Sequence, residues 1–150
     1  MRVLLAIDES AASQAAADEV SRRQWPADTT VRVLHIVGKF VPPAQELWYD
    51  AGGNLDQARR EIKDRFQALV EETAKRLAEH DLNIETSIRD GEVGKTIIQE
   101  AKEWKADLIV VGSRGHAMFK RLLTGSVSHY VVDNASCPVE VVHQKQDADG

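Results

Sequence analysis

The chain alternates between short apolar runs and longer stretches in which apolar residues recur at helical spacing. Runs rich in Val, Ile and Leu are typical of strands buried in a parallel sheet. They predict five strands, at residues 3–7, 31–37, 84–88, 108–111 and 139–142. The amphipathic stretches between them predict four helices, at residues 10–23, 54–80, 93–104 and 122–133.

Strands that alternate with helices predict a single α/β domain with a doubly wound parallel sheet and helices on both faces. We expect this domain to span residues 1–145, and we expect the polar, acidic residues 146–150 to form a disordered tail. Ligands of such sheets bind at the carboxyl ends of the strands, where the strand order reverses. Asp8 and Gly112 both follow predicted strands at that edge.

The segment 38–53 is the one long stretch without a periodic pattern, and it contains Trp48 and Tyr49. Loops of this length in compact domains are often functional. Two interpretations stay open. The segment could cover a bound ligand, with Trp48 against it, or its aromatic residues could anchor the loop to the sheet edge.

Composition narrows the function classes. The chain has 150 residues, a formal net charge of −5 and no basic block, which argues against a surface that neutralises nucleic-acid phosphates. Because Cys137 is the single cysteine of the sequence, an intrachain disulfide is excluded. We expect Cys137 to act as a small buried hydrophobe. No apolar stretch approaches the length of a membrane span and no leader pattern precedes the first strand, so we expect a soluble, cytoplasmic protein.

Glycines after the fourth predicted strand suggest a phosphate site. Gly112 and Gly115 are followed nine residues later by Gly125 and Ser126, where another helix is expected to begin. Glycine lets main-chain N–H groups approach an anion closely, and a helix N-terminus favours negative charge. Arg114, between the first two glycines, could pair with a phosphate. The alternative is a set of ordinary turn glycines with a serine helix cap.

Two common nucleotide motifs do not fit. A dinucleotide motif would need glycine where Met118 stands, and a P-loop ending at Ser126 would need a lysine between the glycine and the hydroxyl residue. Gly94, Lys95 and Thr96 imitate a P-loop, but Arg89 occupies the position of its first glycine. We therefore interpret that segment as an ordinary glycine turn and helix start.

The segment 107–142, which includes this glycine spacing, closely resembles the universal stress protein family, in its ATP-binding subgroup. The subgroup is marked by Gly, two residues, Gly, nine residues and then Gly-Ser/Thr, which stands here as Gly112, Gly115, Gly125 and Ser126. The segments 122–123, 127–128, 136–139 and 3–10 also fit the family pattern. The resemblance runs over nearly the whole chain.

The resemblance implies the strand order 3-2-1-4-5, which makes Asp8 and Gly112 neighbours. It implies ATP as the ligand, with adenine contacted by main-chain groups around Ile36 and with Mg²⁺ or Mn²⁺ held through the phosphates. Asp8 could then accept from a ribose hydroxyl or reach the ion. The residues expected to bind the nucleotide are Ala6, Ile7, Asp8, Ile36, Val111, Gly112, Arg114, Gly115, Gly125, Ser126, Val127 and Ser128.

Three functions follow as alternatives. The first is a dimeric, ATP-binding regulatory module of the stress response, and the second is slow ATP hydrolysis or phosphoryl transfer at the same pocket. Efficient phosphoryl transfer needs a positioned nucleophile and charge stabilisers, and the sequence offers at most Arg114 beside Mg²⁺, which favours binding. The third is a response-regulator receiver, whose residues would be Asp8, Glu9, Asp90, Ser113 and Lys145. Protein partners are unknown.

The last strand, 139–142, is expected at a sheet edge, where unpaired main-chain groups invite another strand. The resemblance implies that two copies pair there antiparallel about a two-fold axis, giving a homodimer. Glu140 departs from the family pattern, in which an apolar residue is usual at this position. It could face solvent or repel its mate near the axis.

Overall fold

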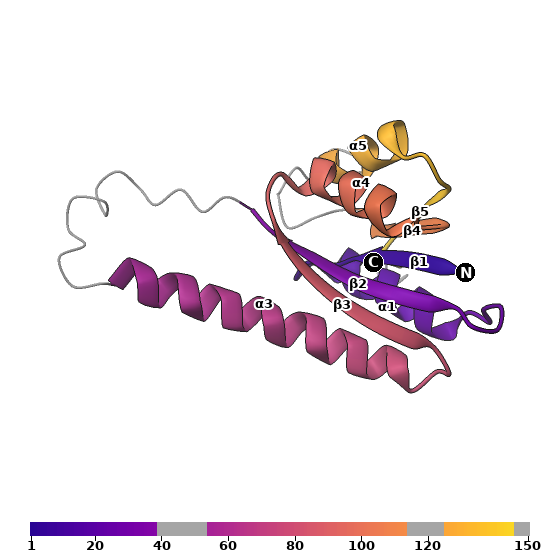
Figure 1. Cartoon of the computed structure of the whole chain (residues 1–150), viewed down its shortest axis with the longest axis horizontal. Coiled ribbons are helices and arrows are strands. Elements are labelled where there is room, and N and C mark those ends of the chain that lie inside the picture. The colour runs from indigo at the N-terminus through magenta and orange to yellow at the C-terminus, as the bar shows by residue number, and fades with distance from the viewer. Residues whose placement is uncertain (39–53, 114–124, 146–150) are drawn as a thin grey trace, which may run out of the picture.

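The computed structural model describes residues 1–38, 54–113 and 125–145. Its sheet has five parallel strands in the order β3-β2-β1-β4-β5, as the resemblance implies. The order reverses between β1 and β4, whose carboxyl ends therefore lie side by side (Figure 1). The strands are β1 (Arg2–Ala6), β2 (Thr30–Val37), β3 (Asn83–Asp90), β4 (Leu108–Gly112) and β5 (Val139–Val142).

Helices cover both faces of the sheet, which confirms the doubly wound α/β fold. Helices α1 (Ala11–Arg22) and α3 (Asn54–Ala78) pack on one face. Helices α4 (Val93–Trp104) and α5 (Ser126–Asn134) pack on the other, so that the sheet lies between the two layers in Figure 1. The N-terminal half of α3 extends past the end of the sheet.

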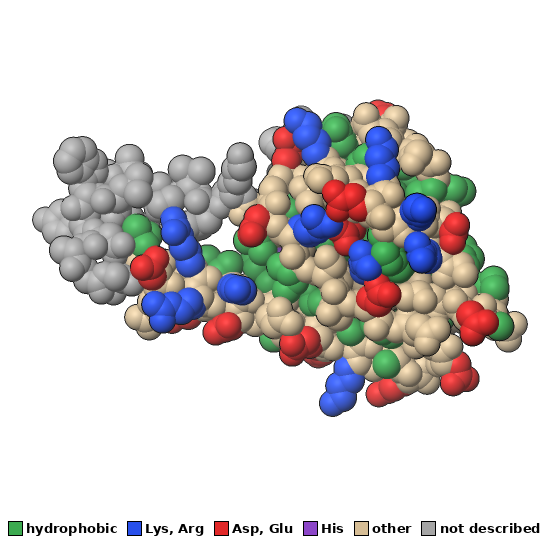
Figure 2. Space-filling model, in the orientation of Figure 1, with side chains coloured by type: hydrophobic (Ala, Val, Ile, Leu, Met, Phe, Trp, Pro, Cys, Tyr) green, Lys and Arg blue, Asp and Glu red, His purple; other side chains and the backbone are tan. Residues whose placement is uncertain are grey.

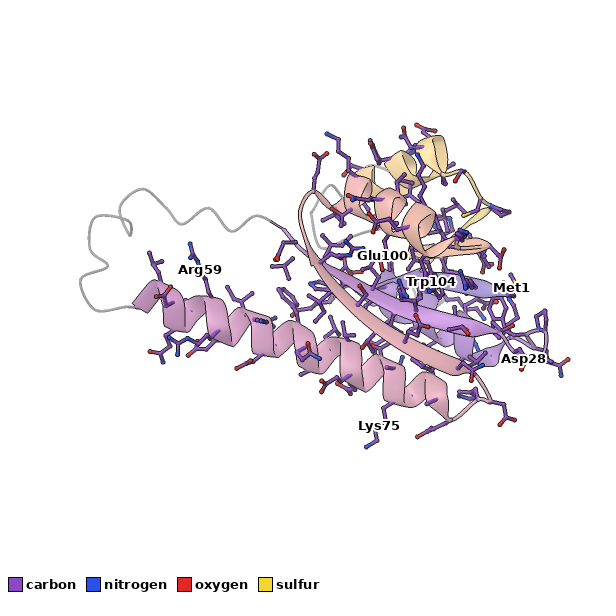
Figure 3. All side chains as sticks on the ribbon, viewed as in Figure 1. Met1, Asp28, Arg59, Lys75, Glu100 and Trp104 are labelled. Carbon is purple, nitrogen blue, oxygen red and sulfur yellow. The ribbon has the colours of Figure 1, made fainter. Side chains whose placement is uncertain are left out.

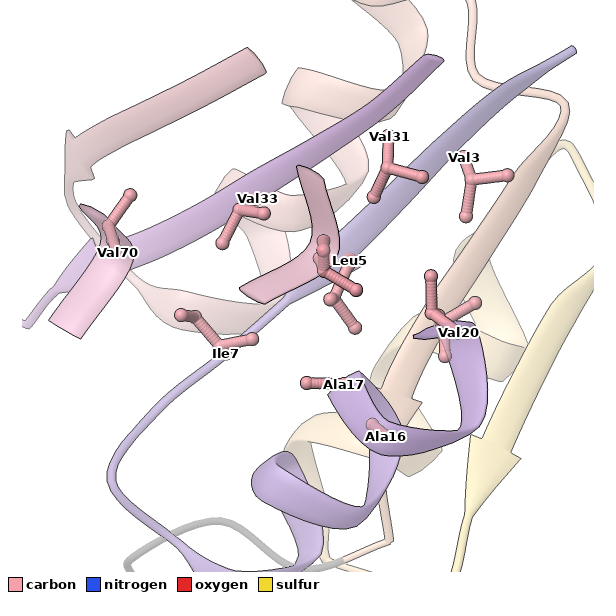
Figure 4. Close-up of a cluster of buried hydrophobic side chains, with 11 residues drawn as sticks. Val3, Leu5, Ile7, Ala16, Ala17, Val20, Val31, Val33 and Val70 are labelled. Carbon is pink, nitrogen blue, oxygen red and sulfur yellow. The ribbon is translucent and has the colours of Figure 1, made fainter. Parts of the chain in front are cut away.

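The period-two alternation of side chains in a strand explains why both faces are apolar. In β1, Val3 and Leu5 join the cluster under α1 and α3, which Figure 4 shows in close-up. Leu4 between them joins the cluster under α4 and α5. All three side chains are fully buried, as expected for the central strand of a sheet covered on both faces.

Element ends differ from the predicted ones at two places that matter for the site. Strand β1 ends at Ala6, one residue earlier than expected. Helix α5 begins at Ser126, because Gly125 before it has the extended backbone of an N-cap, with φ −69° and ψ 158°. The prediction of a helix running continuously from residue 122 is therefore wrong at Gly125, and residues 122–124 lie outside the described residues.

A buried carboxylate that sequence analysis did not single out ties α4 to the sheet. Glu100, on the side of α4 facing the sheet (Figure 3), accepts a hydrogen bond of 2.8 Å from Arg32 Nη1. Its other oxygen forms an ion pair with Arg89 Nη2 at 2.5 Å. The Arg32 guanidinium also lies over the Trp104 ring, 4.4 Å from its centroid. Because Glu100 is only 1% exposed, these cations are what makes its burial tolerable.

The outer surface carries charges of both signs. Figure 2 shows Lys and Arg side chains interspersed with Asp and Glu over one face of the molecule, without a continuous basic field. Among the helices that the structure describes, none is long and apolar enough to cross a membrane.

Candidate functional site

A cavity of about 260 Å³ opens where the sheet order reverses. Seven of the residues predicted to bind a nucleotide line it: Ala6, Ile7, Asp8, Ile36, Val111, Gly112 and Val127. They come from the carboxyl ends of β1, β2 and β4 and from the first turn of α5. The strand order thus brings together segments that are distant in the sequence.

The inner wall of the cavity is apolar. Val93 and Ile97 of α4 contribute to it, together with Ile36 and Val127. The apolar spacing predicts Val93 and Ile97 on the inward face of a helix, but it carries no signal that they reach a ligand site. A pocket with such walls suits a flat apolar group such as a base, with main-chain groups at its rim to give orientation.

Hydrogen bonds fix the turn between β1 and α1. Asp8 Oδ1 accepts from Ser10 N–H at 2.8 Å, and Ser13 Oγ accepts from Asp8 N–H at 2.8 Å. Ser10 Oγ in turn accepts from Ser13 N–H at 3.1 Å, which caps α1. Asp8 therefore has a structural role beside the expected ligand role, and its carboxylate is held at the rim of the cavity.

The main chain of Ile36 lies beyond the last paired residue of β1. The register ends with Ala6 opposite Leu34, and Ile7 N–H donates to Leu34 O at 2.8 Å. Because peptide groups of a parallel strand point alternately to its two neighbours, the N–H and C=O of Ile36 point to the side where β1 has ended. The resemblance implies an adenine contact at this position, and that contact stays a prediction.

The start of α5 forms a second edge of the cavity. Gly125, its N-cap, has no side chain to bond the first N–H groups of the helix. Ser128 Oγ instead donates to Gly125 O at 2.9 Å, while Gly125 N–H donates to Ser113 O, so the helix start is anchored to the end of β4. The first N–H groups of α5, which receive no side-chain cap from Gly125, lie beside Val127 in the cavity wall and suit an anion.

Packing requires glycine at position 112, independently of any ligand. A Cβ added there would lie 2.7 Å from the main-chain carbon of Ala12 and 2.7 Å from the nitrogen of Ser13. Glycine thus permits the close approach of α1 to the end of β4, a reason that its spacing in the sequence could not reveal.

Several predicted residues cannot be placed. Arg114 and Gly115 lie outside the described residues, and so do His116 and the aromatic pair Trp48 and Tyr49. Their expected contacts, and the two interpretations of the segment 38–53, stay predictions. So does any ligand contact of Ser128, whose hydroxyl bonds main-chain carbonyls.

Two aspartates that the receiver alternative needs together, Asp8 and Asp90, lie in different pockets. Asp90 lies in another groove, between α3 and β3, together with Val37 and Arg59. Asp8 lines the cavity at the reversal of the sheet instead. A receiver would need the two carboxylates at one phosphorylation site, so this arrangement favours the nucleotide interpretation. Within residues 1–38, 54–113 and 125–145, no group of three His, Cys, Asp or Glu residues is arranged to hold a metal ion.

Comparisons with known proteins agree with the fold. The model of the universal stress protein family matches residues 1–143. Universal stress protein YxiE of Bacillus subtilis is 33% identical over 144 residues, covering 94% of this chain and 97% of that protein. The structure of UspA from Lactobacillus plantarum aligns with a TM-score of 0.71 at 28% identity, covering 95% and 97% of the two chains. The protein MJ0577 shares the fold, with a TM-score of 0.82 at 23% identity and 97% coverage of both chains.

Proposed function

The chain belongs to the universal stress protein family, and we propose that it is an ATP-binding regulatory module of the stress response. The observation that carries this proposal is the cavity at the reversal of the sheet, with the main chain of Ile36 at one end and the N-terminus of α5 at the other. One end suits a base and the other suits phosphates, which together describe a nucleotide.

Solved relatives support the choice of an adenine nucleotide. A family member from Arabidopsis thaliana was solved with AMP bound, and it shares the fold with a TM-score of 0.66, 21% identity and coverage of 99% and 94% of the two chains. Another universal stress protein was solved with cAMP, with a TM-score of 0.67, 22% identity and coverage of 97% and 98%. We extend that ligand class to this chain because its cavity has apolar walls and lies at the carboxyl ends of β1, β2 and β4.

In the proposed complex, the base lies between Ile36 and the apolar side chains of Ile97 and Val127. The phosphates lie against the N–H groups at the start of α5, where the helix dipole stabilises their charge. Asp8, at the rim, accepts from a ribose hydroxyl. Mg²⁺ or Mn²⁺ bound through the phosphates would offset their remaining charge.

We also propose that two copies pair through β5. This strand is a sheet edge, and its four residues are only half-buried. Glu140 does not oppose such pairing, because Arg23 holds its carboxylate with two hydrogen bonds of 2.6 and 2.7 Å. This pair raises the pKa of Arg23 and neutralises a charge that would otherwise face its mate.

Proline substitution at the start of α5, compared with proline at the start of α1, tests the proposed contact between the phosphates and α5. Ser126 is the first residue of α5, where proline fits the helix backbone and follows a Gly125 that is already extended. Ser126→Pro removes one N–H and the hydroxyl, Ser126→Ala removes the hydroxyl alone, and Ala11→Pro removes one N–H at the start of α1. Calorimetry with ATP and Mg²⁺ is expected to show weaker binding by about 1–3 kcal/mol for Ser126→Pro. Ala11→Pro should bind like wild type.

Two outcomes would contradict the proposal. Wild-type protein freed of nucleotide that takes up no ATP would overturn it outright. If Ser126→Pro and Ala11→Pro bind ATP with equal affinity, the phosphates do not contact the start of α5. Phosphate release measured on the same samples decides between a binding module and the slow ATPase, since the binding module predicts ATP that stays intact over many dissociation times.

A further inference from the structure

The β1–β2 ladder stops although β2 continues. Ile7 N–H donates to Leu34 O at 2.8 Å, so Ile7 still lies alongside β2. A regular parallel ladder would continue with a bond from Ile36 N–H to the carbonyl of Ile7, pairing Ile7 with His35. The register ends one pair earlier, with Ala6 opposite Leu34, so this bond is not formed.

A side chain occupies the carbonyl that the ladder would use. His35 Nδ1 lies 2.8 Å from Ile7 O. A carbonyl only accepts, so Nδ1 carries the hydrogen and donates it. His35 is 4% exposed, its ring packs on Phe66 with centroids 4.1 Å apart, and its Nε2 is buried without a hydrogen-bond partner among the described residues. Leaving a buried nitrogen such as Nε2 without a partner costs free energy. Among the described residues, the bond from Nδ1 to Ile7 is therefore the polar contact that stabilises the buried ring.

We propose that His35 is a positioning residue for the nucleotide: by taking the Ile7 carbonyl, it ends the ladder and leaves the Ile36 N–H for an acceptor nitrogen of a purine base. His35 is itself among the residues that line the cavity, but its ring packs on Phe66 and donates to the Ile7 carbonyl. It acts through the main chain, by withholding an internal acceptor from a donor that lines the cavity. This inference rests on the proposed function for its ligand but not for the exchange of hydrogen bonds in the protein.

The exchange can be tested without ligand. In His35→Leu, the Ile7 carbonyl loses its donor, and the Ile36 N–H is expected to move into the ladder. Amide hydrogen exchange of Ile36, measured by NMR, should then be slower than in wild type by about 5- to 10-fold. A side chain that only filled space would, when removed, speed exchange throughout the region.

Two variants provide controls. His35→Asn retains an N–H donor at the same distance from Cβ as Nδ1, so Ile36 should exchange as in wild type. Phe66→Leu loosens the packing around the His35 ring without removing the bond, so it should lower stability but leave Ile36 unprotected. If His35→Leu does not fold, His35→Gln, a longer amide that cannot superpose its donor on Nδ1, takes its place. Ile36 exchange that is unchanged or faster in the substituted protein would overturn the proposal.

The ligand contact is tested with AMP and its 1-deaza, 3-deaza and 7-deaza analogues, each of which lacks one ring nitrogen. One analogue is expected to bind wild-type protein about 3- to 10-fold more weakly than AMP, and this difference should disappear in His35→Leu but persist in His35→Asn. A difference that survives in His35→Leu would overturn this inference alone. No binding of AMP or ATP to wild type would instead overturn the proposed function, while the hydrogen-exchange result would still stand.

Discussion

Replacing Gly112 with alanine tests how tightly α1 packs on the end of β4. The added Cβ would meet three main-chain atoms of α1, two at 2.7 Å and one at 2.8 Å, where an ordinary contact begins at 3.4 Å. The first turn of α1 would therefore have to retreat by about 0.7 Å. Main chain cannot swing aside as a flexible side chain can, and this turn also carries the Ser10 cap and the Ser13–Asp8 bond.

We expect Gly112→Ala to lower the free energy of unfolding by about 2–3 kcal/mol, the upper part of the usual range for overpacking, because the contact is rigid main chain. In a domain of this size, that loss corresponds to a fall in Tm of about 4–12 °C. Urea denaturation followed by circular dichroism measures it, with the slope m unchanged if only stability is affected.

Gly38→Ala is the matched control. Among the residues that the structure describes, a Cβ at Gly38 would have no neighbour within 4 Å, so alanine there should be neutral or slightly stabilising. If Gly112→Ala unfolds within about 0.5 kcal/mol of Gly38→Ala, a surface-type effect, the close approach of α1 to β4 is refuted.

Four further outcomes are expected. Glu100→Gln should cost about 2–3 kcal/mol in urea because it uncouples two cations from a buried acid, whereas Glu103→Gln, on a half-exposed side chain, should cost at most about 0.5 kcal/mol; equal losses would refute the buried network. Asp8→Ala should weaken ATP binding by calorimetry by on the order of 1–3 kcal/mol, and unchanged affinity would remove Asp8 from the site. Burial, reinforced by the charge of Asp107, raises the pKa of the Cys137 thiol, so alkylation near pH 8 should be slower than for an unfolded control and should speed up as pH rises; equal rates would contradict this. Light scattering should give a dimer for wild type and a monomer for Val141→Lys, and a wild-type monomer at micromolar concentration would contradict pairing through β5.

The fold was predictable because apolar periodicity is a local property. Each described strand and helix overlaps the segment that the pattern predicts, since a strand covered on both faces must be apolar along its length. The strand order was not available from periodicity, because it depends on which strands pair across the sheet. It came from the family resemblance.

The features that the pattern missed are polar residues at apolar positions, and each has a distant partner. Arg32 and His35 interrupt the apolar run of β2, and Glu100 stands among Ile97, Ala101 and Trp104 on the inward face of α4. Such interruptions are a signal that a buried polar contact exists. The sequence cannot name the partner, since Glu100 meets Arg32 only after two strands and a helix have packed.

The premature end of β1 has the same origin. Whether Ile7 pairs with β2 is decided by the His35 ring, 28 residues away, and not by the propensity of Ile7 itself. Likewise the need for glycine at position 112 arises from α1, an element far from it in the sequence. Long-range contacts of this kind are outside the reach of a periodic pattern.

The central claim is that an adenine nucleotide binds in the cavity at the reversal of the sheet. The direct measurement is a titration of ¹⁵N-labelled protein with ATP and Mg²⁺, followed by amide chemical shifts. We expect the largest changes at Asp8, Ile36 and Val127, which line that cavity, and none at Thr86 and Asp90 in the groove between α3 and β3. Shifts confined to that groove, with Ile36 and Val127 unmoved at saturation, would contradict the account.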